Sequence, residues 1–141
     1  MDDSYKPSDE QFRTWYENTL YKVYKPAISF RIGQPAADVD QLLQTCQAGC
    51  FTFITAWNPD SVPLPPAEND IRQKALIQFL QENKYGWLEG QGVSLDKSWP
   101  AEESLFVLGM TRTTGQELAK KFGQKAIVFG AMHKVPELVF C

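Results

Sequence analysis

The sequence predicts a single α+β domain, an α/β two-layer sandwich in which helices pack on a mixed, mostly antiparallel sheet. Three observations predict it. The chain of 141 residues has the length of one domain. Helical and strand patterns alternate along it, and the strands of the second half are spaced closely enough for hairpins. An apolar fraction of 43% is enough for a core in a chain of this size.

The first half begins with a predicted aromatic-rich helix. Ser8 followed by Gln11 is a capping-box pattern, apolar residues then follow at helical spacing as far as Val23, and Pro26 ends the pattern. We therefore divide the chain into an N-terminal amphipathic helix region, residues 1–26, and a single α/β domain, residues 27–141. The predicted elements are, in order, a helix over 8–24, a strand over 27–32, a short helix over 39–46 with Gly49 as its left-handed C-terminal residue, and a strand over 50–57.

The second half opens with a loop over residues 58–66, whose four prolines exclude regular structure. Pro66 suits the first turn of the helix that follows. The predicted elements are a helix from Pro66 to about Asn83, a strand over 85–88, a glycine-rich turn at Gly90–Gly92, a strand over 103–110, a helix over 113–122 ending at Gly123, and strands over 125–130 and 138–140.

Charge narrows the possible partners. The net charge of -3 argues against a general nucleic-acid binder, and no apolar run is long enough to cross a membrane. The acidic start does not resemble a targeting peptide, so we expect a cytoplasmic protein. Residues 112–134 nevertheless carry five basic side chains and one acidic side chain. This basic patch either complements helix ends or offers weak binding to nucleic acid, against which the net charge argues.

The three cysteines do not predict a disulfide framework or a metal site. Cys46 and Cys50 are half of a zinc-ligand spacing, but the chain has one histidine, His133. Both cysteines suit buried structural positions instead. We expect no metal and no cofactor.

Several short motifs resemble a known family. They are Phe30-Arg31-Ile32-Gly33-Gln34, Ile54-Thr55-Ala56-Trp57-Asn58-Pro59, Glu68-Asn69 with Arg72, Gly90-x-Gly92, Trp99-x-x-Glu102 with Ser104, and Phe122-Gly123-Gln124-x-Ala126. In this order they are similar to the bacterial domain-of-unknown-function family numbered thirty-two ninety-three. The resemblance runs from about residue 27 to the C-terminus. It implies a small soluble bacterial protein and brings no activity, catalytic residue or cofactor with it.

Polar residues of these motifs suggest a site for a small anion. Asn58 follows a buried strand and leads toward a helix N-terminus, a place that favours anions. Asn69 and Arg72 share one face of that helix, and a guanidinium binds phosphate or carboxylate in a bidentate way. Further candidates for the same pocket are Arg31, Gly90, Gly92 and Gln124. Alternatively these residues only shape turns and cap helices.

A carboxylate pair offers the one candidate for catalysis. Glu102 and Glu103 begin a strand, and adjacent carboxylates support acid–base chemistry when they are close and buried. On a strand they point to opposite faces, however. We therefore retain Glu102 alone, and whether the protein is an enzyme stays open.

Two classes of function remain. The first is binding of a nucleotide or another phosphorylated or carboxylated metabolite in the polar pocket. The second is a non-catalytic protein–protein interaction through the aromatic N-terminal helix, because Trp15, Tyr16, Tyr21 and Tyr24 lie on or near it and aromatic residues anchor interfaces.

Overall fold

The structure, a computed structural model, describes residues 7–141. The helices are α1 (Asp9–Glu17), α2 (Ala37–Thr45), α3 (Pro66–Glu82) and α4 (Arg112–Lys121), with a single 3-10 turn, η1, at Pro59–Ser61. The strands are β1 (Thr19–Val23), β2 (Ile28–Phe30), β3 (Cys50–Ile54), β4 (Trp87–Ser94), β5 (Glu102–Leu108), β6 (Ala126–Ala131) and β7 (Glu137–Phe140). The predicted α+β domain is confirmed.

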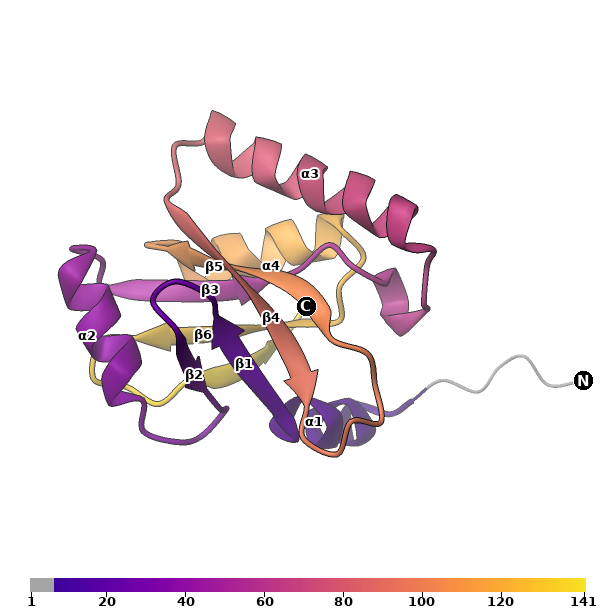
Figure 1. Ribbon diagram of the computed structural model, residues 1–141, viewed down its shortest axis with the longest axis horizontal. Helices are drawn as coiled ribbons and strands as arrows, with labels where there is room; N and C mark the ends of the chain where they lie inside the picture. Colours follow the sequence, from indigo (N-terminus) through magenta and orange to yellow (C-terminus); the bar gives the residue numbers. More distant parts are fainter. Residues whose placement is uncertain (1–6) are drawn as a thin grey trace, which may run out of the picture.

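All seven strands belong to one curled sheet in the order β2-β1-β4-β5-β3-β6-β7 (Figure 1). Every strand pair among the described residues is antiparallel, so the sheet that we expected to be mixed contains no parallel pair there. Helices α2, α3 and α4 each connect two strands that are not neighbours in the sheet, so these helical connections do not place parallel strands side by side.

The predicted helix over residues 8–24 is wrong in its second half. The capping box of Ser8 and Gln11 is present, but α1 ends at Glu17. Residues Thr19–Val23 instead form β1, which pairs with both β2 and β4. Tyr21 and Val23 both point into the core from β1, a spacing of two that belongs to a strand. The aromatic residues assigned to one helix are therefore divided between a helix, a strand and a turn.

The predicted turn at Gly90–Gly92 is also wrong, because both glycines lie inside β4. At Gly90 an added Cβ would lie 1.9 Å from the carbonyl oxygen of Lys22 in β1. The glycine lets the two strand backbones approach, a role that the sequence pattern does not distinguish from a turn. Similarly, Gln47 and not Gly49 takes the left-handed conformation after α2, whereas Gly123 takes it after α4 as expected.

Two apolar clusters lie on opposite faces of the sheet. Helices α3 and α4 cover one face, where Leu76, Leu80 and Leu118 pack against the strands. The other face holds an aromatic cluster under α2, in which Phe51 and Phe106 stack with centroids 4.4 Å apart. Alternate residues of β3 and β5 supply both clusters, so these central strands are buried on both sides. The loop from β3 to α3 leaves the end of β3 and turns toward the start of α3 (Figure 1).

Candidate functional site

Five of the predicted site residues converge around the loop between β3 and α3. They are Asn58, Asn69, Arg72, Glu102 and Gln124, which come from the loop, from α3, from the start of β5 and from the turn after α4. Their polar atoms contact one another and the backbone of the loop. The arrangement has two parts, one built on Asn58 and Asn69 and the other on Arg72 and Gln124.

Asn58 and Asn69 form the first part. The backbone N–H of Asn58 donates to Oδ1 of Asn69 at 2.9 Å, and Nδ2 of Asn69 donates to Oδ1 of Asn58 at 2.8 Å. Oδ1 of Asn58 also accepts from the N–H of Leu64 at 3.0 Å. Asn58 has a φ of 46°, in the left-handed region that asparagine tolerates. With Asn69 only 1% exposed, this pair closes the loop from inside.

Arg72 and Gln124 form the second part. Nε of Arg72 donates to the carbonyl oxygen of Ala56 at 2.9 Å, and Nη2 donates to that of Phe122. Nε2 of Gln124 donates to the carbonyl oxygen of Trp57 at 2.9 Å. The guanidinium that we expected to bind an anion therefore joins the loop to the end of α4.

Gln73 belongs to the same network and was missed from the sequence. Its Oε1 accepts from the N–H of Ala56 at 2.9 Å, and its Nε2 donates to the carbonyl oxygen of Glu103 at 3.1 Å. A signal was available, because Asn69 and Gln73 stand on the same helix face as the buried Leu76 and Leu80. Polar residues on a core face need buried partners.

Glu102 lies half-buried beside Asn58. Its Oε2 accepts from Nδ2 of Asn58 at 2.8 Å and from Nε1 of Trp99 at 3.2 Å. Burial raises the pKa of this carboxyl group above its ordinary value, while the two hydrogen bonds oppose the rise. Within residues 7–141, no hydrogen bond reaches Oε1 and no basic side chain pairs with Glu102.

Glu103 points to the opposite face of β5, as expected. Both of its carboxylate oxygens accept from the hydroxyl of Tyr24, at 2.9 and 2.8 Å. The two glutamates therefore do not form the close carboxylate pair that acid–base chemistry requires.

The remaining predicted residues lie elsewhere or act differently. Nη2 of Arg31 donates to the carbonyl oxygen of Glu17 at 2.9 Å, away from the loop. Gly90 lies against β1, and Gly92 is opposite Glu102 in the β4–β5 pair. Of the five basic residues in the 112–134 patch, Arg112 pairs with Glu137 at 3.2 Å and Lys125 with Asp9 at 3.3 Å.

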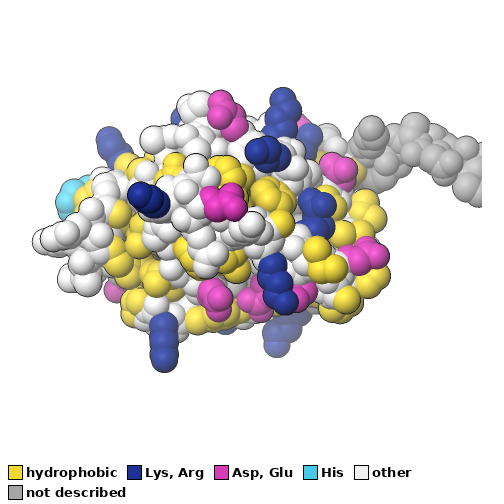
Figure 2. Space-filling model, turned by 90° about the horizontal axis from the view of Figure 1, so that it is seen from above, with side chains coloured by type: hydrophobic (Ala, Val, Ile, Leu, Met, Phe, Trp, Pro, Cys, Tyr) yellow, Lys and Arg dark blue, Asp and Glu magenta, His cyan; other side chains and the backbone are white. Residues whose placement is uncertain are grey.

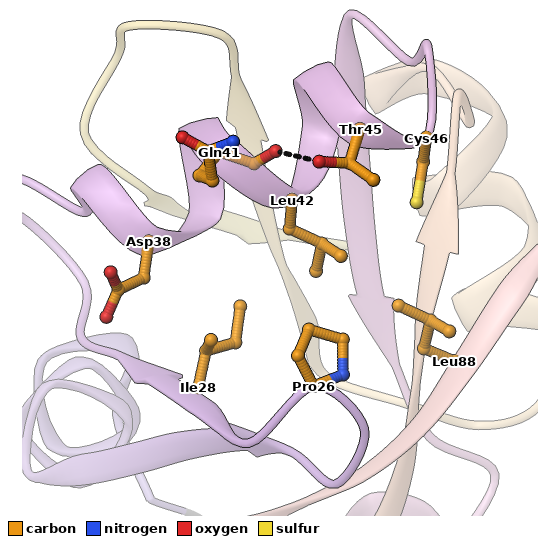
Figure 3. Close-up of a pocket in the computed structure, with 8 residues that line it drawn as sticks. All are labelled: Pro26, Ile28, Asp38, Gln41, Leu42, Thr45, Cys46 and Leu88. Carbon is orange, nitrogen blue, oxygen red and sulfur yellow. Dashed lines mark hydrogen bonds between the residues drawn. The ribbon is translucent and has the colours of Figure 1, made fainter.

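A groove lies apart from this polar network, between α2, the β1–β2 turn and β4 (Figure 3). Its volume is about 330 Å³. Its lining residues are Pro26, Ile28, Asp38, Gln41, Leu42, Thr45, Cys46 and Leu88. None of the predicted site residues contributes to it. Among the described side chains, no group of three or more His, Cys, Asp or Glu residues is arranged to hold a metal ion.

Large hydrophobic side chains are exposed around the polar network. Trp99 is 41% exposed and Val62 is 56% exposed. Trp15 of α1 and Leu95 are exposed as well, and the N–H of Leu95 donates to the carbonyl oxygen of Asn18 at the end of α1. On the face shown in Figure 2, hydrophobic side chains lie among basic and acidic ones. We call Trp15, Val62, Leu95 and Trp99 the Trp99 surface.

Comparison with known proteins gives one match. The family model described as "Protein of unknown function (DUF3293)" matches residues 54–127. This segment contains the whole polar network and leaves out Arg31, although we expected the resemblance to begin near residue 27. No curated protein and no solved structure matches the chain. None of the helices in the described part is long and apolar enough to cross a membrane.

Proposed function

Because this chain belongs to the DUF3293 family, whose description assigns no function, we propose a function from the site alone: the chain is a binding domain that docks a protein partner on the Trp99 surface. The observation that carries this proposal is that the polar residues are hydrogen-bonded to one another and to the backbone of the loop. They brace the β3–α3 loop from below, and apolar side chains remain on the outside.

Bracing matters because docking costs conformational entropy. A loop that is already held in one conformation loses less freedom when a partner binds, so more of the contact energy appears as affinity. Val62 lies in the segment held by the bond from Leu64 to Asn58, and Trp99 is held through Glu102. Exposed tryptophan on a rigid support is typical of interface anchors.

The parts of the Trp99 surface are linked through short contacts. Ser94 pairs with Thr19 at the end of the β1–β4 ladder, and its hydroxyl oxygen accepts from the N–H of Trp99 at 3.2 Å. The hydroxyl of Thr19 donates to the carbonyl oxygen of Trp15 at 2.8 Å. Trp15 thus contributes to docking as one side chain of a larger surface, and not as an aromatic helix alone.

The same contacts favour docking over the small anionic ligand of our first hypothesis. An anion at this site would have to draw Arg72 away from two carbonyl oxygens and would lie near the carboxylate of Glu102. Small molecules bind in concave sites. The groove of about 330 Å³ is such a hollow, but it lies apart from the polar network. Nucleic-acid binding at residues 112–134 is weakened by the two ion pairs in that patch.

Site-specific photocrosslinking tests the docking surface. A photoreactive amino acid is placed at Val62 and, as a matched control, at Ile71, which is 68% exposed on α3 outside the surface. We expect one discrete protein adduct in cells from position 62, lost when Trp99→Ala is added, and no such adduct from position 71. An adduct of twice the chain's mass would identify a second copy as the partner. The same adducts from both positions, or none from position 62, would overturn the proposal.

A thermal-shift screen tests the anion hypothesis directly. Purified protein is heated with nucleotides, phosphorylated metabolites and carboxylates, since a ligand at 100 times its Kd stabilises by about 2.7 kcal/mol. We expect no specific stabilisation. A stabilising anion whose effect disappears in Arg72→Lys would favour the pocket over the docking surface.

A further inference from the structure

We propose that the carboxylate of Glu102, beside the ring of Trp99, binds the ammonium or guanidinium group of a lysine or arginine side chain on the docked partner. This inference rests on the proposed function and names the chemistry that the partner brings. It also replaces the anion that we expected at this site with a cation.

The geometry leaves one carboxylate oxygen for a ligand. Asn58 and Trp99 both donate to Oε2, which fixes the orientation of the carboxylate group. Within residues 7–141, Oε1 has no hydrogen-bond partner, and it is not among the polar atoms closed off from solvent. A cation can therefore reach Oε1 without displacing either existing bond.

The electrostatics favour a cation there. Glutamate is seldom buried unless it is paired, because losing water costs the charged form free energy. Glu102 is half-buried, and this burial raises the pKa of its carboxyl group. Tyr16 and Tyr21 interact electrostatically with Glu102, and burial raises the pKa of both hydroxyls, so that they carry no charge at neutral pH. A lysine or arginine from a partner would supply the missing opposite charge.

Trp99 adds a second attraction for a cation. Its indole N–H is directed at Oε2, so the carboxylate lies at the edge of the ring, and the ring is 41% exposed. Ammonium and guanidinium groups bind the faces of tryptophan rings, and the methylene chains of lysine and arginine pack on apolar surface. The site thus fits a long basic side chain better than a small inorganic cation.

Glu103 supplies the matched control. It adjoins Glu102 in sequence, but both of its oxygens already accept from Tyr24 on the other face of the sheet. Replacing Glu103 by Gln removes the same charge from the chain as replacing Glu102 by Gln. A difference between the two variants therefore reports the position of the carboxylate and not the net charge.

A titration followed by NMR tests the inference. The probe is N-acetyl-lysine methylamide, the uncharged control is N-acetyl-norleucine methylamide, and the reporter is the indole N–H signal of Trp99, assigned with Trp99→Phe. At low salt we expect the lysine probe to shift this signal in a saturable way and the norleucine probe to leave it unchanged. In Glu102→Gln, whose side-chain oxygen can still accept from Asn58 and Trp99, binding of the lysine probe weakens by about tenfold or more, and in Glu103→Gln it is retained.

The outcomes separate this inference from the proposed function. Equal shifts with both probes, or unchanged lysine binding in Glu102→Gln, would overturn the cation site. If the cation site fails these tests but the Trp99-dependent crosslink from position 62 persists in Glu102→Gln, the partner docks without a lysine or arginine bound to Glu102. If the crosslink is absent while the lysine probe binds through Glu102, the protein partner is wrong and the cation site stands.

Discussion

The guanidinium group of Arg72 suggests binding of an anionic ligand, but its hydrogen bonds go to the backbone of the protein itself. Its guanidinium joins the carbonyl oxygens of Ala56 and Phe122, which would lose a charged donor in Arg72→Ala. We expect that variant to lose about 2–3 kcal/mol of stability in urea unfolding. Arg13→Ala, which removes an arginine that lies over the ring of Phe140, is the control and should cost less. Equal stabilities of Arg72→Ala and the parent protein would show that Arg72 does not brace the loop.

Glu102 gives a prediction about pH. Burial raises the pKa of its carboxyl group in the folded state above the ordinary value of 4.5, so the folded protein takes up a proton more readily than the unfolded chain. The stability gained by protonation is present below pH 4.5 and is lost as pH rises through the folded pKa. Glutamine has no carboxyl group to ionise, so Glu102→Gln does not lose stability in this way as the pH rises. We therefore expect Glu102→Gln to melt at a higher temperature than the parent protein at pH 7, and the difference to shrink toward pH 4.

Melting curves at several pH values check this prediction, with Glu103→Gln as the control. This control removes the same charge from a carboxylate that lies on the other face and accepts hydrogen bonds from Tyr24. A Glu102→Gln protein that melts below the parent at pH 7 would mean that the bonds from Asn58 and Trp99 outweigh the cost of burial.

At the scale of the elements, Gly90 and Gly92 make a matched pair within β4. In Gly90→Ala the new Cβ would meet the carbonyl oxygen of Lys22, which forces β1 away from β4. We expect a loss of about 3 kcal/mol. In Gly92→Ala the nearest atom is Cγ2 of Thr19 at 3.5 Å, an ordinary contact, so the loss should stay below about 1 kcal/mol. Urea unfolding measures both, and equal losses would contradict the close approach of β1.

In the whole molecule, Asn18 separates helix α1 from strand β1, the first strand of the sheet. Deleting residues 1–17 removes α1 but leaves all seven strands, and the helix takes with it the buried Phe12 and the partly buried Tyr16. We expect a folded protein that is less stable by about 2–3 kcal/mol. Deleting residues 1–25 also removes β1, which joins β2 to β4, so the sheet should fail to form. Dispersion of the amide NMR signals distinguishes the two, and a folded 26–141 fragment would restore the division at residue 26.

Local signals in the sequence determined the ends of several elements. The capping box of Ser8, the start of α3 at Pro66 and the end of α4 at Gly123 all appear where the sequence predicts them. Each depends on the dihedral angles and hydrogen bonds of a few consecutive residues, which the sequence itself fixes. The antiparallel pairing, in contrast, depends on which strands meet after the helical crossovers.

Local patterns in the sequence predicted the single α+β domain and most of its elements, and they singled out the polar residues of which five lie together beyond the end of β3. Long-range pairing makes residues 19–23 a strand, because Leu20 and Val23 continue the helical spacing of α1, and β2 and β4 supply strand partners on both sides. The tertiary structure also decided what the polar residues do. Hydrogen-bonding groups pair with whichever partners the fold brings within reach, so Asn58, Asn69 and Arg72 bind the loop, and Oε1 of Glu102 remains for a ligand.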